Sequence, residues 1–180
     1  MRTVTYTKNY YTIDELTGRA REIAFRNIID HYQEMIMEFD WIEFKESLQS
    51  FLEEFDLAII DYSVGLYNHS YIDDNANEYR QDKNNIEINS DVEKLNNMIK
   101  TSDELNLTGV WSDSVVMQYF KDNAVNRVTY NDIHIHLSNI TEYSLKEFMR
   151  LSEESLEREE YVLDHAYIYE LEFDKDGEIY

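Results

Sequence analysis

Negative charge constrains how this chain can fold more than any other feature of its sequence. The 180 residues contain 38 aspartates and glutamates against 16 lysines and arginines, which gives a formal net charge of −22 at pH 7. Such a charge opposes compaction through self-repulsion, so the chain needs a sizeable apolar core. Hydrophobic residues make up 43% of the sequence and aromatic residues 14%, which is enough for one. We therefore predict a single folded domain over residues 1–180 with a strongly acidic surface.

The acidic residues concentrate in two blocks. Residues 30–79 contain 13 acidic residues and one basic residue, Lys45, and residues 147–180 contain 12 acidic and 3 basic residues. An acidic field of this kind repels nucleic acids and anionic membranes and attracts basic protein surfaces. We therefore predict a basic protein as the partner, with no direct binding of nucleic acid or membrane. Acidity that only keeps the protein soluble is the alternative.

The residue types that are scarce exclude several kinds of chemistry. The chain has no cysteine, so it has no disulfide and no thiolate nucleophile, and its 4 glycines cannot build a convincing phosphate-binding loop. No nucleophile–base motif is present. The N-terminus lacks the apolar run of a signal peptide, and no apolar stretch approaches the ~20 residues of a membrane span. We predict a cytoplasmic protein that is not an enzyme and has no cofactor.

The apolar spacing predicts helices and strands in alternation. A capping-box pair, Thr12 and Glu15, predicts a helix start, and three- and four-residue steps predict helices over residues 40–55, 91–100 and 112–122. Asp40 is predicted as the N-cap of the second helix. We predict strands over 3–13, 57–67 and 127–140, a polar loop over 73–90 with a short strand at 86–88, and a C-terminal hairpin over 165–180. The fold class is α+β, with helices packed on a small antiparallel or mixed β-sheet.

The C-terminal acidic block is predicted to lie on one long helix from Thr141 to Asp164. On such a helix Leu145, Met149, Leu156 and Leu163 share one stripe, which we expect to face the core. A second stripe carries Glu153, Glu157, Glu160 and Asp164, with Glu154 and the aromatic Tyr161 beside it. Neighbouring carboxylates at this spacing lie ~5–6 Å apart at Cβ. Duplex DNA shows one charge per ~3.4 Å on each strand, so the predicted row has the same sign on a similar length scale.

The first acidic block supplies a second set of predicted partner-binding residues. Asp30, Glu34 and Glu38 recur at four-residue steps. Asp40 follows them, and Asp73 with Asp74 lies in the predicted polar loop. The alternative is that the acidic residues near Asp40 stabilise the N-terminus of a helix through its dipole.

A third pattern, Asp132, His134 and His136, alternates along the predicted strand 127–140. Residues at alternate positions of a strand point to one side, and two histidines with a carboxylate can bind Zn²⁺ or Fe²⁺. A metal enzyme built on these residues is therefore the weakest of three hypotheses. Ordinary polar residues on a solvent face explain the pattern as well, and we predict no metal site.

Two segments, YTIDELTGRAREIAF (11–25) and LEFDKDGEIY (171–180), resemble the two ends of a family of small phage and mobile-element proteins. That family opens with an aromatic strand and an Asp-Glu-Leu helix start and ends with a Phe-x-x-Asp-Gly turn. Its usual Gln-Gly-Asp-Gly stretch is missing from residues 64–76 here. The matching motifs are structural, so the resemblance implies no functional residue. Some members carry antitoxin-like labels.

The resemblance implies phage origin and action in the cytoplasm of a bacterial host cell. By analogy, the chain is similar to acidic anti-CRISPR and antirestriction proteins that mimic DNA. The most specific hypothesis is a nuclease inhibitor, an anti-CRISPR protein that binds Cas9 and blocks binding of target and PAM DNA. The alternatives are an antirestriction DNA mimic, and an antitoxin-like or regulatory protein that binds a basic partner protein.

Overall fold

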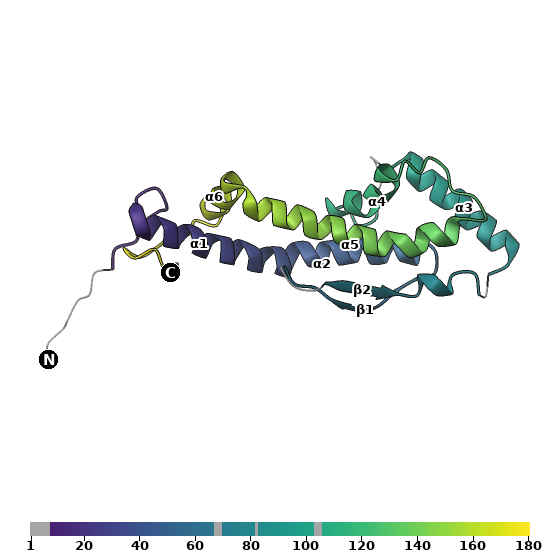
Figure 1. Ribbon diagram of the computed structural model, residues 1–180, viewed down its shortest axis with the longest axis horizontal. Coiled ribbons are helices and arrows are strands. Elements are labelled where there is room, and N and C mark those ends of the chain that lie inside the picture. Colours follow the sequence, from purple (N-terminus) through teal and green to yellow (C-terminus); the bar gives the residue numbers. More distant parts are fainter. Residues whose placement is uncertain (1–7, 67–69, 82, 103–105) are drawn as a thin grey trace. The chain divides into compact units, whose positions relative to one another are not determined.

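Helices dominate the computed structural model, which describes residues 8–66, 70–81, 83–102 and 106–180. One antiparallel pair of strands, β1 (Ile59–Ser63) and β2 (Tyr71–Asp74), accompanies them (Figure 1). The predicted α+β class is confirmed. In chain order, the α-helices of the described residues are α1 (Gly18–Met35), α2 (Trp41–Glu53), α3 (Asn85–Lys100), α4 (Ser112–Asp122), α5 (Ile133–Glu157) and α6 (Glu159–Ile168).

The chain divides into two compact units. The smaller unit combines both chain ends, Met1–Ile36 and Glu153–Tyr180, and the larger unit is the intervening segment Met37–Ser152. A single domain over the whole chain stays a prediction.

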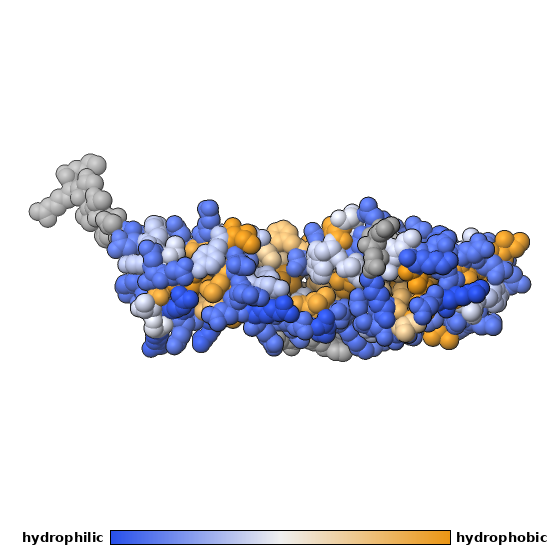
Figure 2. Space-filling view, turned by 90° about the horizontal axis from the view of Figure 1, so that it is seen from above, coloured by the Kyte–Doolittle hydropathy of each residue, from blue (hydrophilic) through white to orange (hydrophobic). Residues whose placement is uncertain are grey.

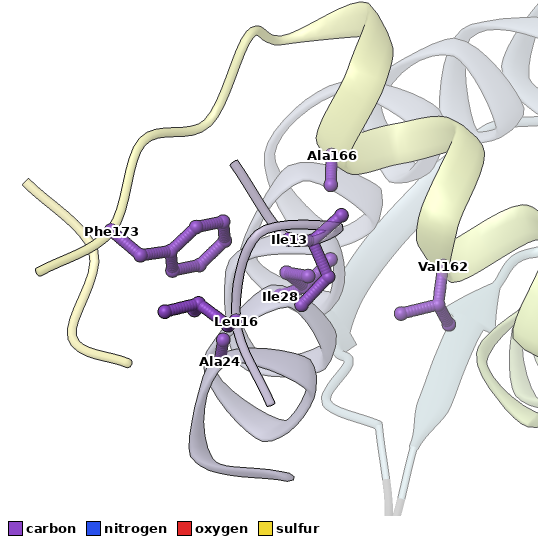
Figure 3. Packing of buried hydrophobic residues seen from close by; sticks show 7 residues of the cluster. All are labelled: Ile13, Leu16, Ala24, Ile28, Val162, Ala166 and Phe173. Carbon is purple, nitrogen blue, oxygen red and sulfur yellow. The ribbon is translucent and has the colours of Figure 1, made fainter. Parts of the chain in front are cut away.

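Helices α1 and α6 form the core of the smaller unit. Ala24 and Ile28 of α1 face Val162 and Ala166 of α6, and all four side chains are buried (Figure 3). The core is completed by Ile13, Leu16 and Phe173. Burying each of the larger apolar side chains contributes roughly 1.5–3 kcal/mol, which offsets the repulsion between acidic surfaces.

Phe173 ties the C-terminal tail to the N-terminal segment. Its backbone exchanges two hydrogen bonds of 2.9 Å with Tyr11, and it also bridges to Ile179. The predicted turn at residues 174–177 is confirmed, because Gly177 N–H donates to the carbonyl oxygen of Asp174 over 3.1 Å. Antiparallel pairing flanks this turn, with Asp174 N–H donating to Glu178 over 2.9 Å and Tyr180 N–H donating to Glu172 over 3.0 Å. The predicted hairpin is therefore confirmed in its C-terminal part, but its predicted start at residue 165 is wrong, because α6 continues to Ile168.

The N-terminal predictions hold in part. Thr12 N–H donates to Glu15 Oε2 over 2.9 Å, as the capping-box spacing predicts, but only a turn follows. Helix α1 begins at Gly18, whose φ of +55° cannot belong to a helix running from Thr12. The predicted strand 3–13 lies partly outside the described residues, and its described part, from Lys8, forms a single bridge at Tyr11.

Aromatic packing around α2 forms the core of the larger unit. The predicted helix over 40–55 is confirmed as Trp41–Glu53. All six apolar residues of its pattern are buried, five on the helix and Phe55 just after it: Trp41, Phe44, Leu48, Phe51, Leu52 and Phe55. Phe44 stacks on Phe148 of α5, with 4.7 Å between ring centroids. Helix α4 packs against α2 and buries Val115, Val116, Tyr119 and Phe120, as predicted, although Trp111 is exposed.

The predicted strand 127–140 is wrong, because α5 begins at Ile133. The apolar residues Ile133, Leu137 and Ile140 are all fully buried, and they recur at four- and three-residue steps, the period of a helix. Ile135, which strand alternation would bury with Ile133, is 49% exposed. The predicted strand at 86–88 is also helical, because Asn84 and Glu87 form a reciprocal capping box that starts α3.

Candidate functional site

The predicted acidic row on the C-terminal helix is interrupted at Arg158. This residue is extended (φ −87°, ψ 107°), so α5 ends at Glu157 and a separate helix, α6, begins at Glu159. The single helix from 141 to 164 is therefore wrong. After the break, Val162 and Ala166 of α6 pack in the core with Ala24 and Ile28 of α1. Glu153 and Glu157 remain exposed at the end of α5, and Glu160 and Asp164 are exposed on α6.

Arg158 partly neutralises the surface that the break creates. Its Nη2 lies 3.9 Å from Glu154, and its Nη1 donates to the Tyr161 hydroxyl over 2.9 Å. The same guanidinium lies over the Tyr161 ring, 5.1 Å from the centroid. The ring of Tyr161, which is predicted beside the acidic row, is therefore already in contact with an arginine of its own chain.

Asp30 and Glu34 are exposed on α1, on the side turned away from α6. The buried residues Ala24 and Ile28 mark the side of α1 that contacts α6, and at about 100° per residue Asp30 lies nearly opposite them. By the same geometry, Glu160 and Asp164 lie opposite the buried Val162 on α6. Asp30 and Glu160 thus lie away from the contact between the two helices, whereas Asp164 lines a pocket with Tyr32 and Met35 of α1.

The acidic residues of the larger unit differ in their surroundings. Glu38 is exposed in the π-helical turn Ile36–Asp40, which precedes α2. Asp40 has helical backbone angles and no capping hydrogen bond, so its predicted N-cap role is wrong. Burial, and then the charge of Glu43, raise the pKa of Asp40 to about 6. Asp40 therefore remains mostly ionised near pH 7 but gains a proton on mild acidification.

The β1–β2 hairpin carries an acidic pair that sequence patterning missed in part. Asp73 on β2 lies directly opposite Asp61 on β1, and both are exposed. Like charges opposite each other destabilise a hairpin, so this pair lowers the stability of the β1–β2 hairpin. Asp74 differs, because its carboxylate accepts hydrogen bonds from Thr141 Oγ1 and from the Ala76 backbone N–H. Asp61 could be found only once the strand register was known.

The Asp132, His134 and His136 pattern does not form a metal site in the structure. Asp132 precedes α5, and His134 and His136 lie on this helix. Residues two positions apart on a helix point to different sides. His136 Nδ1 lies 3.0 Å from the Tyr119 hydroxyl, and burial lowers the pKa of His136, with Asp132 partly opposing the shift. Among the described residues, no group of three or more histidines and carboxylates is arranged to hold a metal ion.

A histidine pair in the smaller unit was not singled out from the sequence. His31 Nδ1 of α1 lies 2.8 Å from His165 Nε2 of α6, and the Tyr32 and Tyr169 rings pack on His165. His165 is almost completely buried, so its imidazole helps to fix α1 against α6 in the neutral form.

Acidification is expected to destabilise the smaller unit through His165. Burial, and then the charge of His31, lower the pKa of His165 from 6.5 to about 4. Between pH 6.5 and pH 4, His165 binds a proton in the unfolded chain but not in the folded chain. The free energy of unfolding is therefore highest above about pH 6.5 and falls towards pH 4. The loss is roughly 2 kcal/mol by about pH 5. Hydrogen exchange of the α6 amides measures it. An equal pH dependence in His165→Gln would contradict the assignment.

Comparison of the chain with protein-family models, with curated proteins and with solved structures found no match. Within the described ranges, no helix is both long and apolar enough to cross a membrane. Hydrophilic residues cover most of the face that Figure 2 shows, with apolar side chains scattered between them.

Proposed function

We propose that this protein is an inhibitor that binds the basic DNA-binding cleft of a host nuclease through its exposed carboxylates. The observation that carries the proposal is the number of these carboxylates without an intramolecular cation. Of the predicted partner-binding residues, Glu154 alone forms an ion pair within the described part of the chain. Among the residues that the structure describes, the exposed members with no ion-pair partner are Asp30, Glu34, Glu38, Asp73, Glu153, Glu157, Glu160 and Asp164.

An arginine-lined cleft is the complementary surface for such residues. Each arginine that contacts DNA phosphate or guanine presents a planar set of donors that also fits a carboxylate. The most specific form of the proposal is an anti-CRISPR protein on Cas9, whose PAM-reading arginines lie in a basic cleft. A restriction enzyme offers the same kind of surface. Binding is expected to weaken with added salt, because long-range attraction between exposed charges is screened.

The positions of Asp30 on α1 and Glu160 on α6, each on the side of its helix away from the α1–α6 contact, favour a second candidate. A protein that copies a duplex needs carboxylates in a continuous row, whereas a protein that grips a small basic partner can contact it from several separate patches. The second candidate is therefore an antitoxin-like or regulatory protein that binds a basic partner protein. It predicts a stoichiometric complex with such a protein and no effect on nucleases.

Neutralising the C-terminal acidic residues tests the surface. The variant carries Glu153→Gln, Glu157→Gln, Glu160→Gln and Asp164→Asn, and we expect it to bind the target nuclease at least about tenfold more weakly. The matched control removes the same number of charges from exposed residues outside the predicted surface: Glu93→Gln, Glu142→Gln, Glu172→Gln and Asp176→Asn. Affinity and inhibition are measured for both. Equal weakening in the two variants would show that net charge alone drives binding.

A further inference from the structure

A pocket of about 290 Å³ lies on the smaller unit, between the last turn of α1 and the last turns of α6. Ligand pockets commonly measure roughly 300–1,000 Å³, so this one suits a single side chain or a molecule of that size. A ligand can reach it, because the lining residues Tyr161, Ile168 and Tyr169 are 39%, 74% and 49% exposed.

Aromatic rings form much of the pocket wall. Tyr32 of α1, Tyr161 of α6 and Tyr169, directly after α6, all line it. Two of these rings are held in place by packing, because the His165 ring centroid lies 4.7 Å from that of Tyr32 and 4.5 Å from that of Tyr169. The face of a tyrosine ring is electronegative and attracts a cation. The wall therefore favours an apolar or cationic group over an anion.

The charges around the pocket favour a cation further. Asp164 lines the pocket, is exposed, and has no hydrogen-bond or ion-pair partner within the described ranges. His165 lines it too, but burial lowers the pKa of His165 to about 4, so its imidazole is neutral near pH 7. The pocket also lies at the C-terminal end of α6, where the helix dipole is negative. An apolar ligand would leave this negative charge uncompensated.

The chain itself supplies no cation to the pocket lining. Neither lysine nor arginine lines the pocket in the part of the chain that the structure describes. Arg158 lies over the Tyr161 ring, 5.1 Å from its centroid, but is not among the lining residues. Asp164 therefore remains available to a cation from another molecule.

An arginine side chain matches this pocket better than a lysine side chain. The guanidinium group is planar and weakly hydrated, so it can stack on a tyrosine ring while one edge donates two parallel hydrogen bonds to a carboxylate. The lysine ammonium group is a compact and strongly hydrated charge, which loses more hydration among aromatic rings. A quaternary ammonium group can contact the rings but has no N–H to donate to Asp164.

We propose that this pocket receives one arginine side chain of the basic partner protein, with its guanidinium beside the tyrosine rings and paired with Asp164. This assignment rests on the proposed function and deepens it, because it names the partner's residue and the pocket that takes it. It also gives Asp164 a role that the other predicted partner-binding carboxylates do not share, since none of them lines the pocket.

Titration of the intact protein with N-acetyl-arginine methylamide, and with its lysine and citrulline counterparts, tests the pocket without the partner. Citrulline has the shape of arginine without the charge. We expect the arginine probe to bind with a Kd below about 5 mM, at least about fivefold more tightly than either counterpart. Binding should shift the methyl resonance of Met35, which also lines the pocket. No binding of the arginine probe, equal binding of either counterpart, or no shift at Met35 would overturn the proposal.

Two variants with matched controls test the lining residues. Asp164→Asn and Tyr161→Leu should each weaken binding of the arginine probe at least about fivefold. Glu159→Gln and Tyr167→Leu make the same changes at exposed positions of α6 outside the pocket and should leave the Kd within about twofold. Wild-type affinity in Asp164→Asn, or equal weakening in the controls, would overturn the assignment. Thermal unfolding of each variant confirms that it is folded.

The pocket and the proposed function fail in different ways. If the arginine probe binds but no nuclease does, the pocket stands and the nuclease is the wrong partner. If a nuclease binds but the arginine probe does not, the pocket assignment is wrong and the proposed function stands.

Discussion

Replacing Gly177 with alanine is expected to destabilise the smaller unit by at least about 3 kcal/mol. A Cβ at this position would lie well inside van der Waals contact of the Ala20 carbonyl oxygen and 2.9 Å from the Ala24 backbone nitrogen. Both atoms belong to the backbone of α1, which cannot move aside without breaking the helix. The φ of +92° adds strain for any L side chain. We expect the C-terminal tail to leave α1 and to expose Phe173.

Gly18→Ala is the matched control for Gly177. Gly18 also has a positive φ, +55°, but nothing lies within 4 Å of where its Cβ would stand. This variant should show only the cost of a left-handed alanine, roughly 1–2 kcal/mol. Urea unfolding measured by circular dichroism gives both losses. Equal destabilisation in the two variants would mean that the close approach of the tail to α1 is wrong.

Asp113→Ala is expected to destabilise the larger unit by about 3–5 kcal/mol. The buried carboxylate of Asp113, in the first turn of α4, accepts hydrogen bonds from the backbone N–H groups of Leu107, Thr108 and Gly109, at 2.9–3.3 Å. Ser47 of α2 and the Thr108 hydroxyl also donate to it, over 2.8 and 2.9 Å. Alanine would leave these donors unpaired in a buried site, so the 107–109 loop is expected to detach from α4.

The pKa of Asp113 gives the sign of a related pH effect. Burial alone would raise this pKa, but the hydrogen bonds from Ser47, Gly109 and Thr108 outweigh it and hold the pKa below its usual value. The stabilisation is therefore present above the unfolded-state pKa of 3.8 and is lost as the pH falls below it.

Asp122→Ala is the control for Asp113→Ala. It removes an exposed carboxylate at the other end of α4 and should cost much less stability. Comparable losses in both variants would contradict the assigned role.

Local sequence patterns were enough to predict α2 and α4. Each helix has apolar residues at three- and four-residue steps and sits between polar segments, so the pattern and the tertiary structure agree. The helical start of α3 was also readable, because Asn84 and Glu87 have capping-box spacing, but the isoleucines at 86 and 88 suggested a strand. In 127–140, similarly, the alternation of isoleucine and histidine hid the helical spacing of Ile133, Leu137 and Ile140.

The break at Arg158 could not be predicted from local patterns. Residues 141–164 have favourable helical spacing throughout, and no glycine or proline marks an interruption. The break is instead associated with a long-range contact, in which Val162 and Ala166 pack on α1, which is more than a hundred residues earlier in the sequence. Tertiary packing commonly overrides local preference in this way. The predicted spacing of the acidic row depended on one continuous helix, so that spacing is wrong. The members of the row are nevertheless exposed, as predicted.

Competition with DNA is the measurement that tests the proposed function most directly. Binding of the protein to guide-loaded Cas9, and to restriction enzymes one at a time, is measured with and without saturating cognate DNA. If the exposed carboxylates occupy a DNA-binding cleft, at least one nuclease binds the protein, and DNA reduces that binding at least about tenfold. The proposed function would be contradicted if saturating DNA left the binding undiminished. It would also be contradicted if the protein bound none of the nucleases but formed a stable complex with a small basic protein.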